Sequence, residues 1–422
     1  MNATIPSPAA GRPVALPMIL TGLSAAFLFC GYEFIRSPAE SLFIAEFGAP
    51  ARVYALGCVP FALALLIYLY GRALSAFGPR RAMLGSMALS LVAFVAAFFT
   101  LKSGLKAFAF LLFVWKESYV VIIAEAFWSF INSTLRGGEG RTWNGPVSGL
   151  GALGSVAGSF LISRYAVSLT TEPFILFCGL LMLPAMLFTH LAYRRAGEPA
   201  ADASEAGGRK GHLHLGILRE NRTVLFIALI IFCAQVVSTV LDLHFSHLVQ
   251  AAYPAKDART AWLGSFWMNV NLVSFGMQFL VSPILLRLAP RRAVQVAIPL
   301  VHVATAGVLL FHPQLGVAAL AYLLFKSLDY SIFRASKETL YVPFSWDTRY
   351  RAKQIVDAFT YRFSKGFTAI ALSALGAFVA IPTGFYAVCA FAFSSIWTAL
   401  AFPLTRARDG QSEKGAAPHK AG

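Results

Sequence analysis

The sequence FGPRRAM at residues 77–83 recurs as LAPRRAV at residues 288–294, 211 positions further along the chain. Three polar positions recur at almost the same distance: Glu33 with Asp242 at 209, Lys116 with Lys326 at 210, and Arg141 with Arg351 at 210. Any one of these pairs could arise by chance. Four recurrences at nearly one spacing indicate that the chain consists of two similar halves.

Around these repeats, apolar blocks of about 20 residues alternate with short polar stretches, the block length that a bilayer core about 30 Å thick demands of a helix. The chain of 422 residues is 58% hydrophobic and 13% charged, and its mean hydropathy is +0.67. A soluble domain carries about 25% charged residues. Lipid excludes open β-structure, because backbone groups must be hydrogen-bonded within their own segment. The composition excludes an ordinary soluble enzyme, a disordered protein and a secreted disulfide scaffold.

The sequence therefore predicts an all-α integral membrane protein with about twelve transmembrane helices in two six-helix halves, a major-facilitator-like architecture by analogy. We expect the first half at 1–193, a linker at 194–222, the second half at 223–405 and a tail at 406–422. The predicted spans are 15–44, 53–71, 83–101, 107–132, 145–163, 173–193, 223–250, 261–286, 293–312, 314–333, 354–381 and 384–404.

The formal charge of +16 follows from the loops. With the N-terminus and every second loop assigned to the cytoplasm, those regions hold 24 Lys and Arg residues, and the opposite side holds 6. This asymmetry follows the positive-inside rule and predicts that both termini are cytoplasmic. The positive charge is then a topology signal, so nucleic acid is not an expected partner.

Twelve ionisable residues fall inside the predicted spans, where each would cost roughly 3 kcal/mol at a helix centre facing lipid. They must therefore face the interior, a wet cavity or each other. One interpretation is a polar translocation path; the alternative is a set of buried pairs that lock helices together. The cations are Arg36, Lys116, Lys326, Arg362 and Lys365, and the acids are Glu33, Glu40, Glu117, Glu125, Asp242, Asp329 and Asp357.

Positive centres with aromatic neighbours suit an anionic substrate that carries a flat ring. We expect Arg36, Lys116, Lys326, Lys365 and Tyr330 to bind it. The residues expected to gate or couple transport are Glu33, Glu40, Glu117, Glu125, Asp242, His247, Asp329, Asp357 and Arg362. No convincing catalytic set, metal cluster or cofactor site is present in the sequence, so we expect a protein that is not an enzyme and uses no cofactor.

The sequence GLGALG at residues 149–154 has the spacing of a dinucleotide-binding loop, but that motif requires a preceding strand. Here it falls inside a predicted membrane helix. Together with Gly158 it predicts a face of small residues that lets two helices approach closely.

Two regions resemble the ATP/ADP antiporter family of nucleotide transporters, which is found in plastids and intracellular bacteria with distant relatives in free-living bacteria. The first contains KETLYVPF at 337–344, YRAKQIVD at 350–357 and RFSKG at 362–366, and the second is FWSFIN at 127–132. The resemblance implies a twelve-helix carrier that exchanges nucleotides, with Glu338, Asp357 and Lys365 in family positions, and a bacterial inner membrane. The chain departs from the family pattern at Ala39, where the family has a lysine, and at Ser364, where it has glycine.

The leading hypothesis is a secondary carrier that moves an anionic metabolite, a nucleotide by the resemblance, by alternating access. A second hypothesis is a proton-coupled transporter of another organic solute that uses Glu33, Asp242 or His247 as the protonation site. A third is a non-transporting scaffold or lipid-handling protein that reuses the fold. The partners expected in each case are a small molecule, the lipid bilayer, or both.

Overall fold

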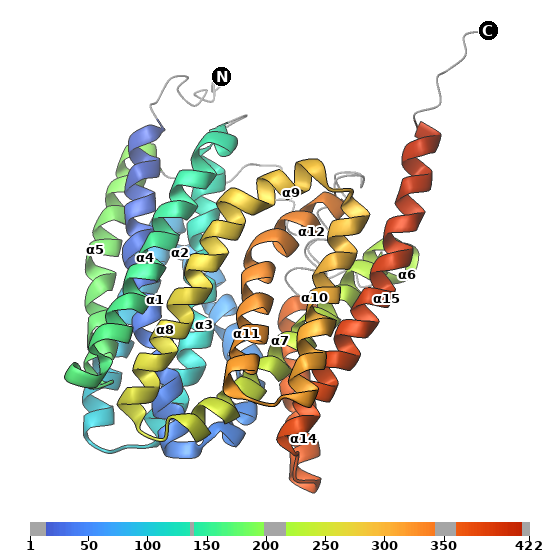
Figure 1. Cartoon of the computed structure of the whole chain (residues 1–422). Helices are drawn as coiled ribbons and strands as arrows, with labels where there is room; N and C mark the ends of the chain where they lie inside the picture. The colour runs from blue at the N-terminus through green and yellow to red at the C-terminus, as the bar shows by residue number, and fades with distance from the viewer. Residues whose placement is uncertain (1–13, 136–138, 198–216, 342–359, 416–422) are drawn as a thin grey trace, which may run out of the picture. The chain divides into compact units, whose positions relative to one another are not determined.

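The computed structural model describes residues 14–135, 139–197, 217–341 and 360–415, and the regular elements in these ranges are helices (Figure 1). They are α1 (Ala15–Phe47), η1 (Ala49–Ala51), α2 (Arg52–Lys102), α3 (Ala107–Thr134), α4 (Glu139–Leu169), α5 (Pro173–Ala196), α6 (Ile217–Glu220), α7 (Arg222–Ala252), α8 (Lys256–Gly276), η3 (Met277–Val281), α9 (Ser282–Leu288), α10 (Arg291–Phe311), α11 (Leu315–Leu328), η4 (Asp329–Phe333), α12 (Arg334–Tyr341), α14 (Tyr361–Phe378) and α15 (Thr383–Gly415).

Ten segments in these ranges are long and apolar enough to cross a membrane. One of them, Ala49–Lys102, has 54 residues. At 1.5 Å per residue this is about 80 Å of helix, more than twice the thickness of the hydrocarbon core. This long segment therefore counts as two crossing helices, or arms. With the shorter apolar helix Phe363–Phe378 added, the described residues contain twelve candidate crossing helices. The predicted all-α membrane fold is confirmed.

The two arms of α2 join at the first copy of the repeated sequence. Gly78 has φ 79° and ψ 168°, a conformation that favours glycine because a Cβ would be strained there. In the second copy α9 ends at Leu288, and Ala289 and Pro290 are extended before α10 begins. We expected a loop over 72–82, but the helix continues to Phe77 and breaks at Gly78 alone. The intervening residues include Ala, Leu and Arg, which are good helix formers.

The chain packs as two compact units. Unit 1 comprises Met1–Leu42, Phe61–Gly207 and Thr260–Met268; unit 2 comprises Phe43–Pro60, Gly208–Arg259 and Asn269–Gly422. Two short segments are thus grouped apart from their neighbours in the sequence. Residues 43–60 pack with unit 2 and residues 260–268 pack with unit 1.

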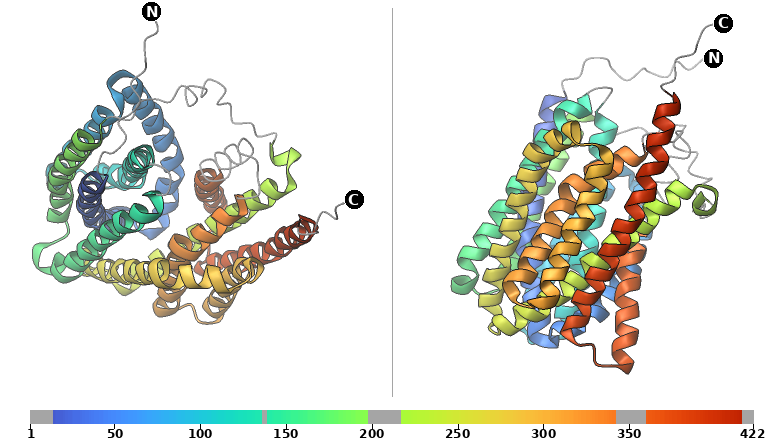
Figure 2. Two further views of the ribbon diagram at one scale, coloured as in Figure 1. Left: turned by 90° about the horizontal axis from the view of Figure 1, so that it is seen from above. Right: turned by 45° about the vertical axis from the view of Figure 1, so that its right-hand side comes forward.

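Unit 1 is a bundle in which α1 and α4 approach closely, and Figure 2 shows its helices end-on in the view from above. A Cβ added at Gly154 would collide with the carbonyl group of Ala26, and one at Gly158 would lie 2.6 Å from the carbonyl oxygen of Cys30. Gly151 faces the ring of Phe29. The predicted small-residue face of α4 is therefore confirmed, and its partner is α1. Close backbone approach of this kind supplies packing energy between helices in lipid.

Unit 2 is organised around α7. In its most apolar window 78% of the residues are buried, a larger share than in any other candidate span of the described ranges. Helices α11, α14 and α15 pack against it, and α10 packs on α15. Asn221 caps its start, because the side-chain oxygen accepts hydrogen bonds from the backbone N–H groups of Thr223 and Val224 at 3.0 and 3.2 Å.

We expect Gly154→Leu to destabilise the protein, because the larger side chain must push α4 away from the backbone of α1. Overpacking of this kind costs about 1–3 kcal/mol or more. Apparent melting temperature in detergent measures the effect. Gly276→Leu in α8 is the matched control, since a Cβ at Gly276 meets nothing within 4 Å. An equal melting temperature for the two variants would contradict the close packing of α1 and α4.

Candidate functional site

Three of the ionisable residues expected at the site lie on α1, and all three are buried. Glu33, Arg36 and Glu40 are 1%, 8% and 2% exposed, and Arg36 Nη1 lies 3.3 Å from Glu33 Oε1. The i, i+3 spacing brings these two side chains to one side of the helix. The guanidinium carbon of Arg36 also lies 3.1 Å from the ring centroid of Trp267 and 5.6 Å from that of Tyr32. Unit 1 therefore holds a guanidinium between a carboxylate and two aromatic rings.

A second cation of unit 1 lies on α3. Lys116 is 2% exposed, its Nζ lies 2.9 Å from Glu117 Oε1, and its Nζ is 4.5 Å from the ring centroid of Phe113. The Glu117 side chain is 18% exposed, so this ion pair is partly accessible. Glu125, one of the acids expected to gate or couple transport, is exposed on the same helix.

Lys326 of unit 2 is half-buried at the end of α11, in a setting unlike that of the other buried cations. Its Nζ donates a 2.9 Å hydrogen bond to Ser238 Oγ of α7. The ring centroids of Tyr322, Phe325 and Tyr330 lie 5.4, 5.8 and 5.8 Å from Nζ. No carboxylate of the described ranges lies within 4.0 Å of Nζ. The ammonium group is held by one hydroxyl and three rings.

The helix changes form directly after Lys326. Residues Asp329–Phe333 make the π-helical turn η4. A π turn adds one residue to the helical repeat, yet Asp329 and Tyr330 both remain near Lys326. The Tyr330 ring centroid lies 5.8 Å from Lys326 Nζ, and the Asp329 carboxylate interacts electrostatically with Lys326. Asp329 and Tyr330 are both half-buried. Such turns occur frequently at functional sites.

The described part of unit 2 contains a buried ion pair that the sequence did not reveal. Arg52 was expected in a loop facing away from the cytoplasm, yet its side chain is 2% exposed at the start of α2. Its Nη2 lies 3.1 and 3.3 Å from the two carboxylate oxygens of Asp242 on α7. Nη1 donates to Ser246 Oγ and, at 3.4 Å, to the carbonyl oxygen of Asp242. The sequence held one signal for this pair. Asp242 lies in a predicted membrane span that contains no Lys or Arg, so a cation from another segment was needed to pair with it.

Two histidines flank this pair on α7. His244 Nδ1 lies 2.8 Å from the carbonyl oxygen of Thr383, and the His247 ring lies 5.6 Å from the Tyr386 ring. His247 also interacts electrostatically with Arg52. The Nε2 atoms of both histidines are buried without a hydrogen-bond partner among the described residues. Acid, guanidinium and imidazole groups are thus gathered in one part of unit 2.

The remaining predicted site residues are only partly described. Lys365 is half-buried on α14, and Arg362 lies in α14 with a side chain outside the described part of the chain. Asp357 and the side chain of Glu338 also lie outside it. The structure thus brings Arg36 to Glu33, Lys116 to Glu117 and Asp242 to Arg52. That the cations of both units converge on one chamber stays a prediction.

Comparison with known proteins agrees with this architecture. The chain matches no protein-family model. It is 25% identical over 207 residues to ADP,ATP carrier protein 1 of Chlamydia muridarum and to its counterpart in Chlamydia trachomatis. Each match covers 43% of this chain and 39% of the relative, so the chain matches about two fifths of the length of these curated relatives.

The similarity to solved structures extends over nearly the whole chain. The nucleoside transporter NupG matches with a TM-score of 0.67 at 11% identity, over 92% of this chain and 99% of that one. A bacterial homologue of the iron transporter ferroportin also gives 0.67 at 11% identity, over 94% and 100%. The xylose transporter XylE from E. coli gives 0.60 at 12% identity, over 92% and 99%.

These features define a class. The chain is a multi-pass integral membrane protein with the fold of the major-facilitator transporters. The solved structures that it resembles include transporters of nucleosides, peptides, xylose and metals.

We expect Arg52→Met and Asp242→Leu each to lower stability by about 3–5 kcal/mol, because each leaves a buried charge without its partner. The double variant removes both charges and should recover much of that loss. Thermal unfolding in detergent measures all three variants, with Lys102→Met as the control. Losses that simply add in the double variant would show that the two charges do not stabilise one another.

Proposed function

We propose that the chain is a secondary carrier for an anionic metabolite of the nucleotide class, working by alternating access. The observation that carries the proposal is the setting of Lys326, a half-buried ammonium group inside a candidate membrane-spanning segment, Leu315–Lys337. Ser238 is its hydrogen-bond partner, and no carboxylate of the described ranges pairs with it. Such a charge costs roughly 3 kcal/mol at a helix centre in lipid. An anionic substrate would offset that cost.

The surroundings of Lys326 also favour a particular kind of anion. A phosphate group forms strong charge-assisted hydrogen bonds with an ammonium group. The rings of Tyr322 and Tyr330 lie within 6 Å of Nζ and offer aromatic faces beside it. Arg36, between Trp267 and Tyr32, repeats the combination of cation and aromatic faces in unit 1. A nucleotide presents the complementary groups, a phosphate and a flat base.

Two further observations support a nucleotide cargo and exchange of the ATP/ADP type. The sequences at 337–344 and 362–366 resemble the ATP/ADP antiporter family, and the chain is 25% identical over 207 residues to proteins named ADP,ATP carrier protein 1. Ala39 stands where that family has a lysine. Lys326 and Arg36 would therefore supply charge that Ala39 cannot.

Alternating access requires ionic contacts that form in one state and break in another, and we assign that role to Arg52 and Asp242. Arg52 belongs to the expected first half of the chain and Asp242 to the expected second half. Their ion pair, with Ser246 as a further acceptor, buries both charges. Burying both charges costs desolvation energy that their attraction must repay, so water that rehydrates them on opening offsets the loss of the pair. Glu33 with Arg36 and Glu117 with Lys116 would act as further exchangeable pairs.

The second candidate function is proton-coupled transport of another organic solute. It is favoured by the group around Asp242, where Arg52 pairs with the carboxylate, His247 interacts electrostatically with Arg52, and Tyr386 packs on the His247 imidazole. Protonation of Asp242 would release Arg52, which would couple a proton to the opening of the ion pair. Exchange and proton coupling differ in what drives uptake, so they can be tested separately.

In proteoliposomes loaded with unlabelled ADP, we expect uptake of labelled ATP. Uptake should fall at least tenfold in Lys326→Met and in Arg36→Met, because each variant removes a positive side chain that would contact the anionic substrate. Lys326→Arg should keep part of the activity, because the positive charge remains. Lys102→Met, a cation outside the proposed site, is the control. Absence of nucleotide uptake together with uptake of another anion would remove the nucleotide cargo and keep the carrier. Absence of any transport would favour a non-transporting protein.

If protons drive transport, an imposed pH gradient should accelerate uptake into empty vesicles without any internal counter-substrate. Asp242→Asn should abolish that acceleration, because the amide cannot take up or release the proton. Counter-substrate exchange is measured in parallel in the same vesicles. A rate that depends on internal nucleotide and ignores the gradient excludes this candidate.

A further inference from the structure

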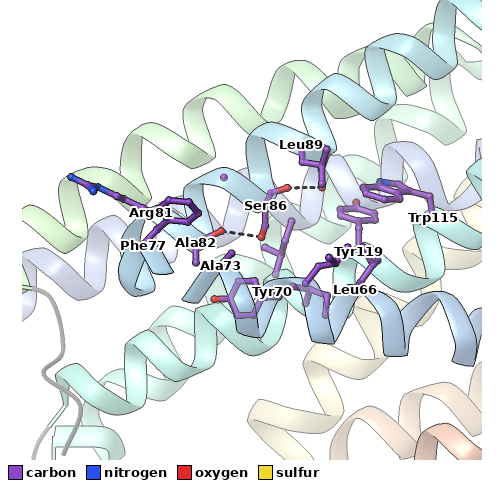
Figure 3. Close-up of a pocket in the computed structure, with 15 residues that line it drawn as sticks. Leu66, Tyr70, Ala73, Phe77, Arg81, Ala82, Ser86, Leu89, Trp115 and Tyr119 are labelled. Carbon is purple, nitrogen blue, oxygen red and sulfur yellow. Dashed lines mark hydrogen bonds between the residues drawn. The ribbon is translucent and has the colours of Figure 1, made fainter. Parts of the chain in front are cut away.

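Unit 1 contains a cavity that the proposed transport site does not use. It has a volume of about 270 Å³ and lies between the two arms of α2 and the face of α3 that carries Trp115, Tyr119 and Ile122 (Figure 3). Lys116 does not line it, and neither do Glu33 and Arg36. The cavity is therefore separate from the buried cations of unit 1.

The lining is mostly apolar, and its two serine hydroxyl groups are already engaged. Ser86 Oγ donates to the carbonyl oxygen of Ala82, and Ser90 Oγ donates to that of Ser86, each at 2.9 Å. The backbone acceptors satisfy the serine protons. The remaining buried polar groups without a partner among the described residues, the Tyr119 hydroxyl and the Trp115 Nε1–H, lie together at one end of the cavity, so most of its length offers only apolar contact. A cavity with this lining favours an apolar chain.

The open edge of the cavity carries large apolar side chains. Leu69, Phe77 and Leu89 are 51%, 61% and 55% exposed, and all three line the cavity. They belong to arms of α2 that are long and apolar enough to cross the membrane. An occupant that enters past these residues would come from the hydrocarbon region of the bilayer.

One end of the cavity carries a charge. Figure 3 shows Arg81 beside Phe77 at one end, with Trp115 and Tyr119 at the other. Arg81 is exposed and has no hydrogen bond or ion pair within the described part of the chain. The neighbouring Arg80 lies against the His190 ring at 3.0 Å, so it is already engaged. The positive-inside pattern places Arg81 at the cytoplasmic surface, where anionic head groups are found.

From this combination we propose that the cavity binds an anionic phospholipid of the bilayer, with one acyl chain between the arms of α2 and α3 and the phosphate at Arg81. The apolar chain matches the lining, and the phosphate matches the unengaged guanidinium group. The Trp115 Nε1–H, buried without a hydrogen-bond partner among the described residues, is expected to stay unpaired against the end of the chain. Bound lipid would hold the bend at Gly78 between its two arms.

Gly85 allows a direct test. Gly85 lines the cavity, and a Cβ added there meets nothing within 4 Å. The leucine side chain of Gly85→Leu can therefore occupy the cavity, and its Cβ clashes with no neighbouring atom. Gly71→Leu is the matched control, because Gly71 lies in the other arm of α2, outside the lining, and is equally open. Both changes replace a helical glycine by the same good helix former, so their effects on helix propensity are alike.

The experiment titrates the purified full chain with phosphatidylglycerol and with phosphatidylcholine of identical acyl chains, and native mass spectrometry counts the bound lipids. We expect tight binding of one phosphatidylglycerol that is lost in Gly85→Leu and retained in Gly71→Leu. Arg81→Gln should lower the preference for phosphatidylglycerol about fivefold, the effect of one cation near an anionic surface. A melting temperature close to that of the unmodified chain verifies that each variant is folded.

Three results would overturn the proposal. Equal lipid binding by Gly85→Leu and Gly71→Leu would show that the cavity is not the site. Equal affinity for the two lipids in the unmodified chain would show that the head-group charge is not recognised. Displacement of the lipid by a water-soluble nucleotide would assign the cavity to the transport path. The measurement requires no transport, so its outcome is independent of the proposed carrier activity.

Discussion

The structure depends on the absence of water from the hydrocarbon core of the membrane. Without water, each backbone N–H and C=O group must be satisfied inside its own helix, and this accounts for the all-helical architecture. The same constraint acts on side chains. Arg52, Lys116 and Arg36 are all less than 10% exposed, and each has a carboxylate within 3.3 Å. Lipid thus forces ionic groups into the interior, where they can meet a substrate or each other.

Lipid also removes the hydrophobic drive that holds helices together in water, so close contact must replace it. Glycine provides that contact in both units. In unit 1, Gly154 and Gly158 of α4 lie against the backbone of α1, and Gly264 of α8 lies against Ile162. In unit 2, Gly366 of α14 lies against the ring of Pro60. These contacts also fix the polar face of α1, since a Cβ at Gly158 would lie 3.1 Å from the Cβ of Glu33.

The sequence predicts the helices well, because the length of an apolar segment and the charge of a loop are local properties of the sequence. Bilayer thickness sets the first, and membrane orientation follows from the second. It also predicts the small-residue face of α4. It does not predict that the helix continues up to Gly78 and breaks there without a loop. Hydropathy cannot distinguish a polar helical segment from a polar loop. The π turn after Lys326 has no sequence signal at all. The buried position of Arg52 was missed because a charged residue next to a predicted span is assigned to a loop. Its partner Asp242 lies 190 residues away, and nothing in the local sequence indicates that pairing.

Four cations, Arg52, Arg36, Lys116 and Lys326, form a graded series in how far their charge is matched by the protein itself, and the grading separates contacts within the protein from contacts available to a substrate. Arg52 has two carboxylate oxygens, a hydroxyl and a carbonyl, so its charge is fully matched within the protein. Arg36 and Lys116 each share one carboxylate with aromatic rings. Lys326 has a hydroxyl and three rings, and the carboxylate that acts on it, Asp329, lies beyond 4.0 Å from Nζ. A cation that its own protein neutralises gains little from an added anion, because the new ion must first displace the resident one. The affinity for an anionic substrate should therefore rise along this series, from Arg52 to Lys326.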